Sequence, residues 1–315
     1  MTTKKIISII VPCFNEELNI LTTYKELKKV SNSEKKYQFQ FIFVDNNSTD
    51  KTAKLIKQIS QKDKDVLGIL LSRNFGPEAS AWAGMTYASG DAIVLIECDL
   101  QNPPQLIHQF INEWEKDYQV VVGIYDKPVD GPLMTMFRKI FYSIFKKISN
   151  IDVPINTTGF GLIDKQVLDA LKALPEKYRF YRGLRSWVGF KTTYINYKRE
   201  KRARGESSYN FFDYIKHAER GVFGFSYLPL DLMIYAGFIL VTLSFIFIFL
   251  YILLSLLFGN PIKGSITILV SIVFFGGIQV LAISILGKYI QVITEEVKAR
   301  PVFIVDKIIK KNASK

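Results

Sequence analysis

The sequence contains few of the residues from which disulfide frameworks and metal modules are built. Its two cysteines are Cys13 and Cys98, and they do not combine with the two histidines at the spacing of a zinc site. Neither a disulfide scaffold nor a structural zinc module is therefore indicated. This composition fits a reducing compartment.

Several local signals are also missing. The sequence has no G-x-G-x-x-G fingerprint and no G-x-x-x-x-G-K-S/T motif, which disfavours dinucleotide and P-loop chemistry. The apolar run from Ile6 to Val11 is too short for the core of a signal peptide, and no small-residue cleavage site accompanies it. We therefore expect the N-terminal domain to remain in the cytoplasm.

Charged residues are absent from two long runs, Leu232 to Phe258 and Gly264 to Gly287. Each run exceeds the roughly 20 residues that cross a bilayer core, so the sequence predicts two transmembrane helices; two buried helices of a soluble core are the alternative. The connector 259–263 is too short to hold a domain, so the helices should form an antiparallel hairpin. Flanking Lys and Arg residues place both chain ends in the cytoplasm.

Positive charge is in excess, with a net charge of +12 over 315 residues, of which 49% are hydrophobic. Such a charge suits nucleic acid, anionic lipid or a phosphorylated substrate. Because of the two apolar runs we expect the membrane and a phosphorylated substrate as partners, and no nucleic acid.

Four regions are expected along the chain. Residues 1–209 form a cytoplasmic domain, and residues 210–230 form an interfacial juxtamembrane segment or a helix packed on that domain. Residues 231–290 hold the two helices, and residues 291–315 form a basic cytoplasmic tail on anionic lipid.

The first 125 or so residues alternate β-rich apolar runs with helix-like segments. This alternation is typical of parallel β-α-β units and predicts an open, mostly parallel α/β sheet. The expected strands are Ile6–Pro12, Phe39–Val44, Val66–Leu71, Ala92–Ile96 and Val120–Gly123, and the expected helices are Glu17–Val30, Asp50–Ser60, Pro77–Ala88 and Pro103–Lys116.

Polar clusters follow four of these strands, at 13–16, 45–48, 72–74 and 97–99. The carboxyl ends of strands in an open α/β sheet form the ligand crevice. Each cluster alone is also compatible with a helix cap or a turn, but their joint occurrence predicts a binding site. Its candidate donor-side residues include Asn47 and Arg73.

The last of these clusters contains two carboxylates, Glu97 and Asp99. They flank Cys98 after an apolar strand, so both point to the same side of an extended segment. A hard divalent cation needs such oxygen ligands when phosphate and water fill its other positions. The spacing therefore indicates a metal-diphosphate site.

The motifs together resemble glycosyltransferase family 2, in particular the dolichyl-phosphate mannose synthases and bacterial polyprenyl-phosphate glucosyltransferases. The resemblance covers nearly the whole chain and implies a GT-A-type fold, a bacterial inner or plasma membrane location and a possible homo-oligomer. It implies that Pro12, Asn15, Glu16 and Asp45 hold the nucleoside, and that catalytic Asp99, with Glu97, holds Mg²⁺ or Mn²⁺. The matching stretches are IVPCFNEE (10–17), VDNNSTD (44–50), LSRNFGPEAS (71–80), GDAIVLIECDLQNPP (90–104), FYRGLRSWVGF (180–190) and YKREKRARGESSY (197–209).

The sequence departs from the family pattern at three places. Asn46 replaces a second acid after the second strand, Glu97 replaces an aspartate, and Thr158-Gly159 stands where many relatives have the aspartate proposed as general base. A phosphate monoester, with a second pKa of about 6, is already anionic at neutral pH and needs no such base. The missing aspartate therefore favours a lipid-phosphate acceptor over a glycan hydroxyl.

An anionic acceptor requires cations instead. Arg199 and Arg202, followed by Ser208, lie shortly before the expected interfacial segment, with Arg138 a further candidate. Guanidinium groups bind phosphate in two-pronged fashion and stay charged. A general attraction of this basic stretch to anionic membrane is the alternative.

The resemblance implies inverting transfer of one sugar from a UDP- or GDP-linked donor to polyprenyl phosphate. The product, a polyprenyl-phosphate monosaccharide, would serve glycan or cell-envelope modification. A polysaccharide synthase is an alternative, although two helices make a poor channel and no Gln-x-x-Arg-Trp stretch occurs. A non-catalytic or regulatory membrane protein that binds nucleotide-sugar is the other, suggested by Asn46 and Thr158-Gly159.

Overall fold

A sheet of eight strands in the order β7-β5-β6-β4-β1-β2-β3-β8 forms the centre of the α/β unit. The structure is a computed structural model that describes residues 4–126, 154, 156–177, 179–200, 226–258 and 265–311. All strands are parallel except β6 and β8. The strands are β1 Ile6–Cys13, β2 Gln38–Asp45, β3 Val66–Leu71, β4 Ala92–Leu95, β5 Val120–Tyr125, β6 Thr157–Asp164, β7 Thr192–Tyr197 and β8 Val305–Lys310.

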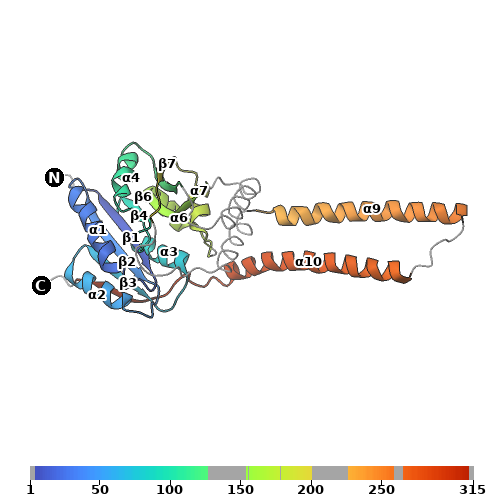
Figure 1. Ribbon diagram of the computed structural model, residues 1–315, viewed down its shortest axis with the longest axis horizontal. Helices are drawn as coiled ribbons and strands as arrows, with labels where there is room; N and C mark the ends of the chain where they lie inside the picture. Colours follow the sequence, from blue (N-terminus) through green and yellow to red (C-terminus); the bar gives the residue numbers. More distant parts are fainter. Residues whose placement is uncertain are drawn as a thin grey trace.

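Helices cover both faces of this sheet (Figure 1). The side chains of β1 alternate between two cores, with Ile9 in one and Ile10 in the other, because successive residues of a strand point to opposite faces. The first core packs under α1 Ile20–Ser33, α2 Thr52–Lys62 and α4 Leu106–Trp114, and the second under α3 Pro77–Tyr87, α6 Lys165–Ala173 and α7 Tyr181–Trp187. The expected fold class, an open and mostly parallel α/β sheet, is confirmed.

Strand β6 inserts antiparallel between β4 and β5, an arrangement that the β-α-β pattern does not predict. Its two glycines tolerate side chains differently. A Cβ atom at Gly161 would lie 2.4 Å from the carbonyl oxygen of Val121, which is fixed in the sheet. A Cβ atom at Gly159 would lie 2.8 Å from Leu95 Cδ2, the tip of a rotatable side chain. The backbone of β5 thus leaves no room for a side chain at Gly161.

Gly161→Ala should therefore destabilise the α/β unit near the upper end of the roughly 1–3 kcal/mol typical of overpacking. Gly159→Ala is the matched control and should cost clearly less, since Leu95 can move. Thermal unfolding of the two variants in detergent measures the difference. Equal midpoints for both variants would contradict the packing of β6 against β5.

The C-terminal segment differs from the basic tail expected for residues 291–315. Its strand β8 pairs antiparallel with β3, where Gly68 faces Ile309 and Leu70 faces Lys307. The Ser72 amide also donates to the Ile304 carbonyl at 3.0 Å. Without β8, β3 would present an unpaired apolar edge to solvent, which folded proteins avoid. Residues Val305–Lys310 are therefore part of the sheet.

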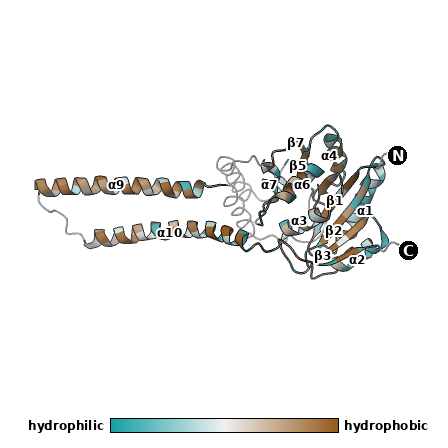
Figure 2. Ribbon diagram, turned by 180° about the vertical axis from the view of Figure 1, so that it is seen from behind, coloured by the Kyte–Doolittle hydropathy of each residue, from teal (hydrophilic) through white to brown (hydrophobic). Residues whose placement is uncertain are grey.

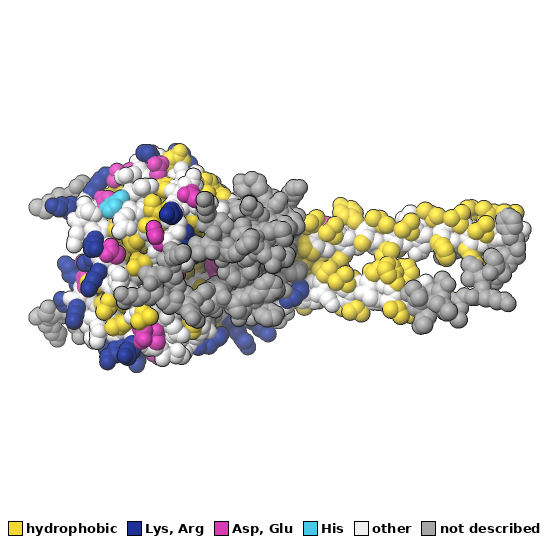
Figure 3. All heavy atoms as spheres, in the orientation of Figure 1, with side chains coloured by type: hydrophobic (Ala, Val, Ile, Leu, Met, Phe, Trp, Pro, Cys, Tyr) yellow, Lys and Arg dark blue, Asp and Glu magenta, His cyan; other side chains and the backbone are white. Residues whose placement is uncertain are grey.

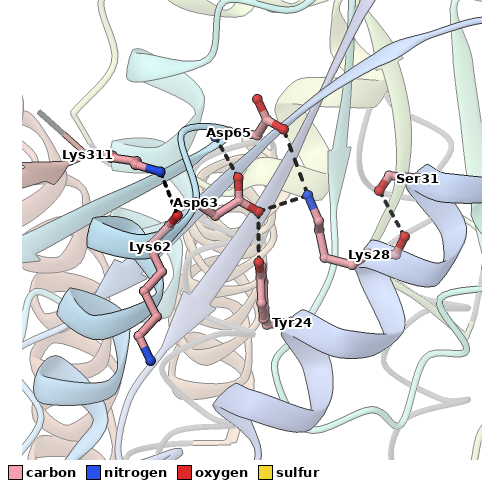
Figure 4. A network of polar contacts seen from close by, with 7 residues as sticks. All are labelled: Tyr24, Lys28, Ser31, Lys62, Asp63, Asp65 and Lys311. Atoms are coloured by element: carbon pink, nitrogen blue, oxygen red, sulfur yellow. Dashed lines mark hydrogen bonds and ion pairs between the residues drawn. The ribbon is translucent and has the colours of Figure 1, made fainter. Parts of the chain in front are cut away.

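A network of polar contacts surrounds the amino end of β3 (Figure 4). Lys28 of α1 lies 2.8 Å from Asp63 Oδ2, and the Tyr24 hydroxyl donates to the same oxygen at 2.8 Å. Lys311, just after β8, donates to the Lys62 carbonyl at 3.1 Å. Exposed ion pairs contribute about 0–1 kcal/mol. The network lies at the amino end of β3, away from the crevice, and we assign it to stability alone.

Two long helices extend side by side from the α/β unit (Figures 1 and 2). They are α9 Leu228–Phe258 and α10 Ser265–Val297, with 31 and 33 residues. At 1.5 Å per residue each exceeds the roughly 30 Å of a bilayer core. Their described side chains are mostly apolar and exposed (Figure 3). By length and composition both helices are able to cross a membrane; most of the expected interfacial segment 210–230 lies outside the described residues.

Candidate active site

Three polar loops meet at the carboxyl ends of β1, β2 and β4. Cys13 pairs with Asp45 across β1 and β2, and the Ile96 amide donates to the Ile10 carbonyl of β1 at 3.0 Å. The loops that begin at residues 13, 45 and 97 therefore lie next to one another. This edge of the sheet is the crevice that an open α/β fold offers to a ligand.

The loop after β1 is bound to the loop after β2 by Asn15. Its backbone amide donates to Ser48 Oγ at 2.9 Å, and its side-chain oxygen accepts the Thr49 amide at 2.9 Å. Asn15 adopts a positive φ of 54°, which asparagine tolerates better than most residues. The Asn15 side chain therefore shapes the expected nucleoside site from within the loop.

Glu16 and Asp45 are the buried carboxylates of this part of the crevice, with exposed fractions of 8% and 3%. Asn19 donates to Glu16 Oε2 at 2.6 Å, and the Ser48 amide lies 3.3 Å from both carboxylate oxygens of Asp45. Burial raises the pKa of Asp45, while hydrogen bonds from Ser48 partly offset that rise. Next to Asp45 in the register lie the part-buried Pro12 and the buried Cys13, and two residues beyond Asp45 lies the exposed Asn47. The structure thus brings the four expected nucleoside residues, Pro12, Asn15, Glu16 and Asp45, to one place, with the donor-side candidate Asn47 beside them.

Asn46, which departs from the family pattern, ties two loops together. Its amide nitrogen donates to Asn74 Oδ1 at 2.9 Å, and its amide oxygen accepts the Phe75 amide at 3.0 Å. The Arg73 guanidinium stacks over the Phe75 ring at 4.2 Å and is exposed at the mouth of the crevice. An asparagine supplies both the donor and the acceptor that this position uses, whereas a carboxylate supplies only acceptors. Asn46 therefore positions the Arg73 loop.

Glu97 and Asp99 lie close to each other after β4. The pKa of Glu97 is raised to about 7, first by burial and then by repulsion from the Asp99 carboxylate, while Arg199 acts in the opposite direction. Asp99 Oδ1 accepts the Gln101 amide at 3.1 Å. Within the described ranges, no group of three or more His, Cys, Asp or Glu side chains is arranged to hold a metal ion by itself. Two carboxylates are nevertheless the protein share that Mg²⁺ typically takes when substrate phosphates provide further ligands, so the acid pair fits a metal-diphosphate complex.

A chain of hydrogen bonds connects Glu97 to β6. Asn102 donates to Glu97 Oε2, and the Tyr197 hydroxyl donates to Asn102 Oδ1. Tyr197 also shares a side-chain hydrogen bond with Thr158, one of the two residues that replace the expected aspartate. Sequence reasoning missed Asn102 and Tyr197, although Asn102 lies within the matched stretch 90–104. These residues hold Glu97 in place.

Of the four expected acceptor-phosphate residues, Arg199 belongs to the described part of the chain. Its Nη2 donates to Gln101 Oε1 at 2.7 Å, and the guanidinium lies 5.4 Å from the centre of the Tyr125 ring. Arg199 therefore lies beside the acid pair. The other three, Arg138, Arg202 and Ser208, lie outside the described residues.

Comparison with known proteins gives consistent results. Residues 8–172 match the family described as glycosyl transferase family 2. The chain is 39% identical to YkcC, an uncharacterized glycosyltransferase of Bacillus subtilis, over 95% of this chain and 93% of that protein. It is 36% identical to the bactoprenol glucosyl transferase of Shigella phage SfII, over 96% of this chain and 97% of the phage protein.

Among solved structures, a similar one is the glucosyl-3-phosphoglycerate synthase of Mycobacterium tuberculosis in complex with Mn²⁺, UDP and phosphoglyceric acid. The two share 19% sequence identity with a TM-score of 0.45, over 64% of this chain and 72% of that chain.

Proposed function

Because this chain belongs to glycosyl transferase family 2, we propose that it transfers one sugar from a nucleotide-sugar to polyprenyl phosphate. Family membership and the open, mostly parallel sheet give the α/β unit a GT-A-type fold. Polyprenyl phosphate is proposed as the acceptor because the chain is similar along nearly its whole length, helices included, to a protein named bactoprenol glucosyl transferase. The product is a polyprenyl-phosphate monosaccharide.

The donor binds at the crevice formed by the β1, β2 and β4 loops. Asp45 and Glu16, with Pro12, Asn15 and Asn47, surround the nucleoside, and Arg73 covers the mouth. A UDP- or GDP-linked sugar then places its diphosphate at Glu97 and Asp99. Support for this division comes from the burial of the carboxylates and from the loops that Asn15 and Asn46 hold together.

Mg²⁺ or Mn²⁺ at this acid pair would neutralise negative charge that develops on the departing diphosphate. Glu97 and Asp99 provide its protein ligands, and Asn102 orients Glu97. The acceptor phosphate, anionic at neutral pH, attacks the anomeric carbon directly with inversion and needs no general base. The absence of an aspartate at Thr158-Gly159 agrees with such an acceptor.

The raised pKa of Glu97, about 7 against an ordinary 4.5, predicts a pH dependence of metal binding. In the metal-free protein, ionisation of this part-buried acid lowers the free energy of unfolding as the pH rises from about 4.5 to about 7. A metal ligand must be ionised, so Mn²⁺ affinity should increase about tenfold from about pH 6 to about pH 8. Titration with Mn²⁺ at each pH, in the presence of UDP or GDP, measures this affinity. Glu97→Gln should show a flatter pH dependence of Mn²⁺ affinity. A wild-type affinity that does not change with pH would contradict the prediction.

Membrane insertion completes the proposal. We place α9 and α10 across the bilayer as a hairpin with the α/β unit and both termini in the cytoplasm, supported by the apolar surfaces of the helices and by flanking Lys and Arg. The crevice then receives its lipid substrate from the cytoplasmic leaflet.

The test is a screen of nucleotide-sugars with the purified full chain in detergent. Each UDP- and GDP-linked sugar, radiolabelled in the sugar, is incubated with Mg²⁺ or Mn²⁺ and undecaprenyl phosphate, and label in the lipid phase is counted. One donor should give label that depends on the metal. If the protein binds a nucleotide-sugar but neither transfers nor hydrolyses any of the donors, the result would instead favour a non-catalytic nucleotide-sugar-binding protein.

A further inference from the structure

Arg185 of α7 is a buried cation that belongs to neither the proposed donor site nor the proposed acceptor site. The residue is 5% exposed, and its Nη1 atom has no hydrogen-bond partner among the residues that the structure describes. Its Nη2 atom reaches the Thr158 carbonyl at 3.5 Å, the outer limit of a hydrogen bond. No carboxylate within the described ranges forms an ion pair with Arg185.

Such an arrangement is costly for a side chain with a permanent charge. Burial lowers the pKa of Arg185, and the neighbouring Arg182 adds repulsion. Tyr181 offers some compensation, because its side chain shares a hydrogen bond with Arg185 and its ring centre lies 5.3 Å from the guanidinium. A guanidinium that is buried without an anion loses several kcal/mol of hydration, and a bound oxyanion would restore that loss through charge-assisted hydrogen bonds.

The position of Arg185 relative to the crevice indicates which anion could reach it. In the antiparallel pairing of β4 with β6, Leu95 faces Gly161. Residues 157–159 therefore continue past the carboxyl end of β4, beside the segment that carries Glu97 and Asp99. Arg182 Nη1 donates to the Thr157 carbonyl at 2.9 Å and Arg185 to the next carbonyl, so both guanidinium groups lie along this extension.

Helix α7 also lies at the end of the α/β unit from which α9 and α10 extend (Figures 1 and 2). A lipid head group would approach from that side, and a donor diphosphate from the acid pair. Both carry phosphate.

We propose that Arg185, assisted by Arg182, forms a phosphate-binding position on the β6 side of the crevice. The ligand is an oxyanion of one of the two substrates, so the inference rests on the proposed function. In the sequence, this position is separate from the basic stretch after β7 to which the family pattern assigns the acceptor phosphate. A planar guanidinium with an unused Nη1 donor suits a tetrahedral phosphate.

Equilibrium binding tests this position without requiring turnover. The purified full chain in detergent is titrated with farnesyl phosphate, a water-soluble lipid phosphate, and separately with UDP and with GDP in the presence of Mn²⁺. Arg185→Gln removes the charge, and Arg185→Lys keeps it but loses the fork and guards against misfolding of the first variant. Arg179→Gln is the control, because Arg179 is a part-buried arginine that donates to the Leu171 and Leu174 carbonyls and stacks on Trp82 instead of contacting β6 carbonyls.

Arg185→Gln should weaken binding of one ligand class about tenfold to a hundredfold, the loss of one charge-assisted hydrogen bond. Arg185→Lys should show a smaller loss, and Arg179→Gln none, whatever its thermal midpoint. A loss confined to farnesyl phosphate assigns the position to the acceptor, and a loss confined to the nucleotides assigns it to the donor.

Unchanged binding of both ligand classes in both Arg185 variants would overturn the proposal and would show that Arg185 has only a structural role beside β6. That result would not touch the proposed function if the wild type still transfers sugar. Conversely, an Arg185-dependent loss in a wild type that transfers no sugar would keep the phosphate position and refute the transferase. A wild type that binds neither ligand would refute both.

Discussion

Asp99→Asn is expected to lower the rate of sugar transfer by about a hundredfold to a thousandfold, a typical cost of losing one electrostatic contact to the transition state. Asp99 is 9% exposed, and its Oδ1 atom accepts the Gln101 amide at 3.1 Å. Asparagine has nearly the same shape and can accept the same hydrogen bond. The loop should therefore keep its structure, and the loss is one of negative charge at the proposed metal.

Initial rates at saturating donor and polyprenyl phosphate measure this effect, with the thermal midpoint as a check on folding. Glu97→Asp is the matched control, since it keeps both charges and restores the aspartate that relatives commonly have at this position. It should retain substantial activity. Full activity of Asp99→Asn in metal-depleted buffer would show that the acid pair holds no metal in the reaction.

Removal of residues 228–315 is expected to destabilise the α/β unit strongly, although the crevice loops described here all precede residue 228. The deletion takes away β8, which pairs with β3, together with Phe303 and Val305, which pack against the second core. Lost apolar burial and lost backbone hydrogen bonds should lower the free energy of unfolding by about 3–5 kcal/mol. The bare edge of β3 should also promote aggregation.

A second deletion separates the strand from the helices. Residues 228–297 are replaced by a flexible Gly/Ser linker, which removes α9 and α10 but keeps β8. This protein should unfold at a clearly higher temperature than the 228–315 deletion and should bind UDP or GDP, while using membrane-embedded acceptor poorly. Equal thermal midpoints for the two deletions would contradict the pairing of β8 with β3.

The first five strands and four helices could be predicted from the sequence because their apolar runs and turn residues are local signals. β8 could not, because Val305–Lys310 is half charged and its partner β3 lies more than two hundred residues earlier in the chain. β6 was missed for a related reason, since its Thr157-Thr158-Gly159 start carries little apolar character. Both segments are strands because they pair with strands that are distant in the sequence, and local sequence patterns do not reveal such pairing.

The crevice was predicted in outline because carboxyl ends of parallel strands converge at one edge. The partners of its residues were not predictable. Asn46 looked like a departure from the family pattern, yet its contacts with Asn74 and Phe75 explain the amide. Arg185 lay within a recognised stretch, but only its burial beside Thr158 singles it out from the other basic residues.

A comparison of two acceptors tests the account most directly. The purified full chain, with Mn²⁺ and the donor identified by the screen, is given undecaprenyl phosphate or undecaprenol in matched detergent, and lipid products are analysed by mass spectrometry. The account predicts a single hexose-sized addition to the phosphate lipid and none to the alcohol, because the phosphate itself is the nucleophile. Equal transfer to undecaprenol, or chains of several sugars on the lipid, would contradict it.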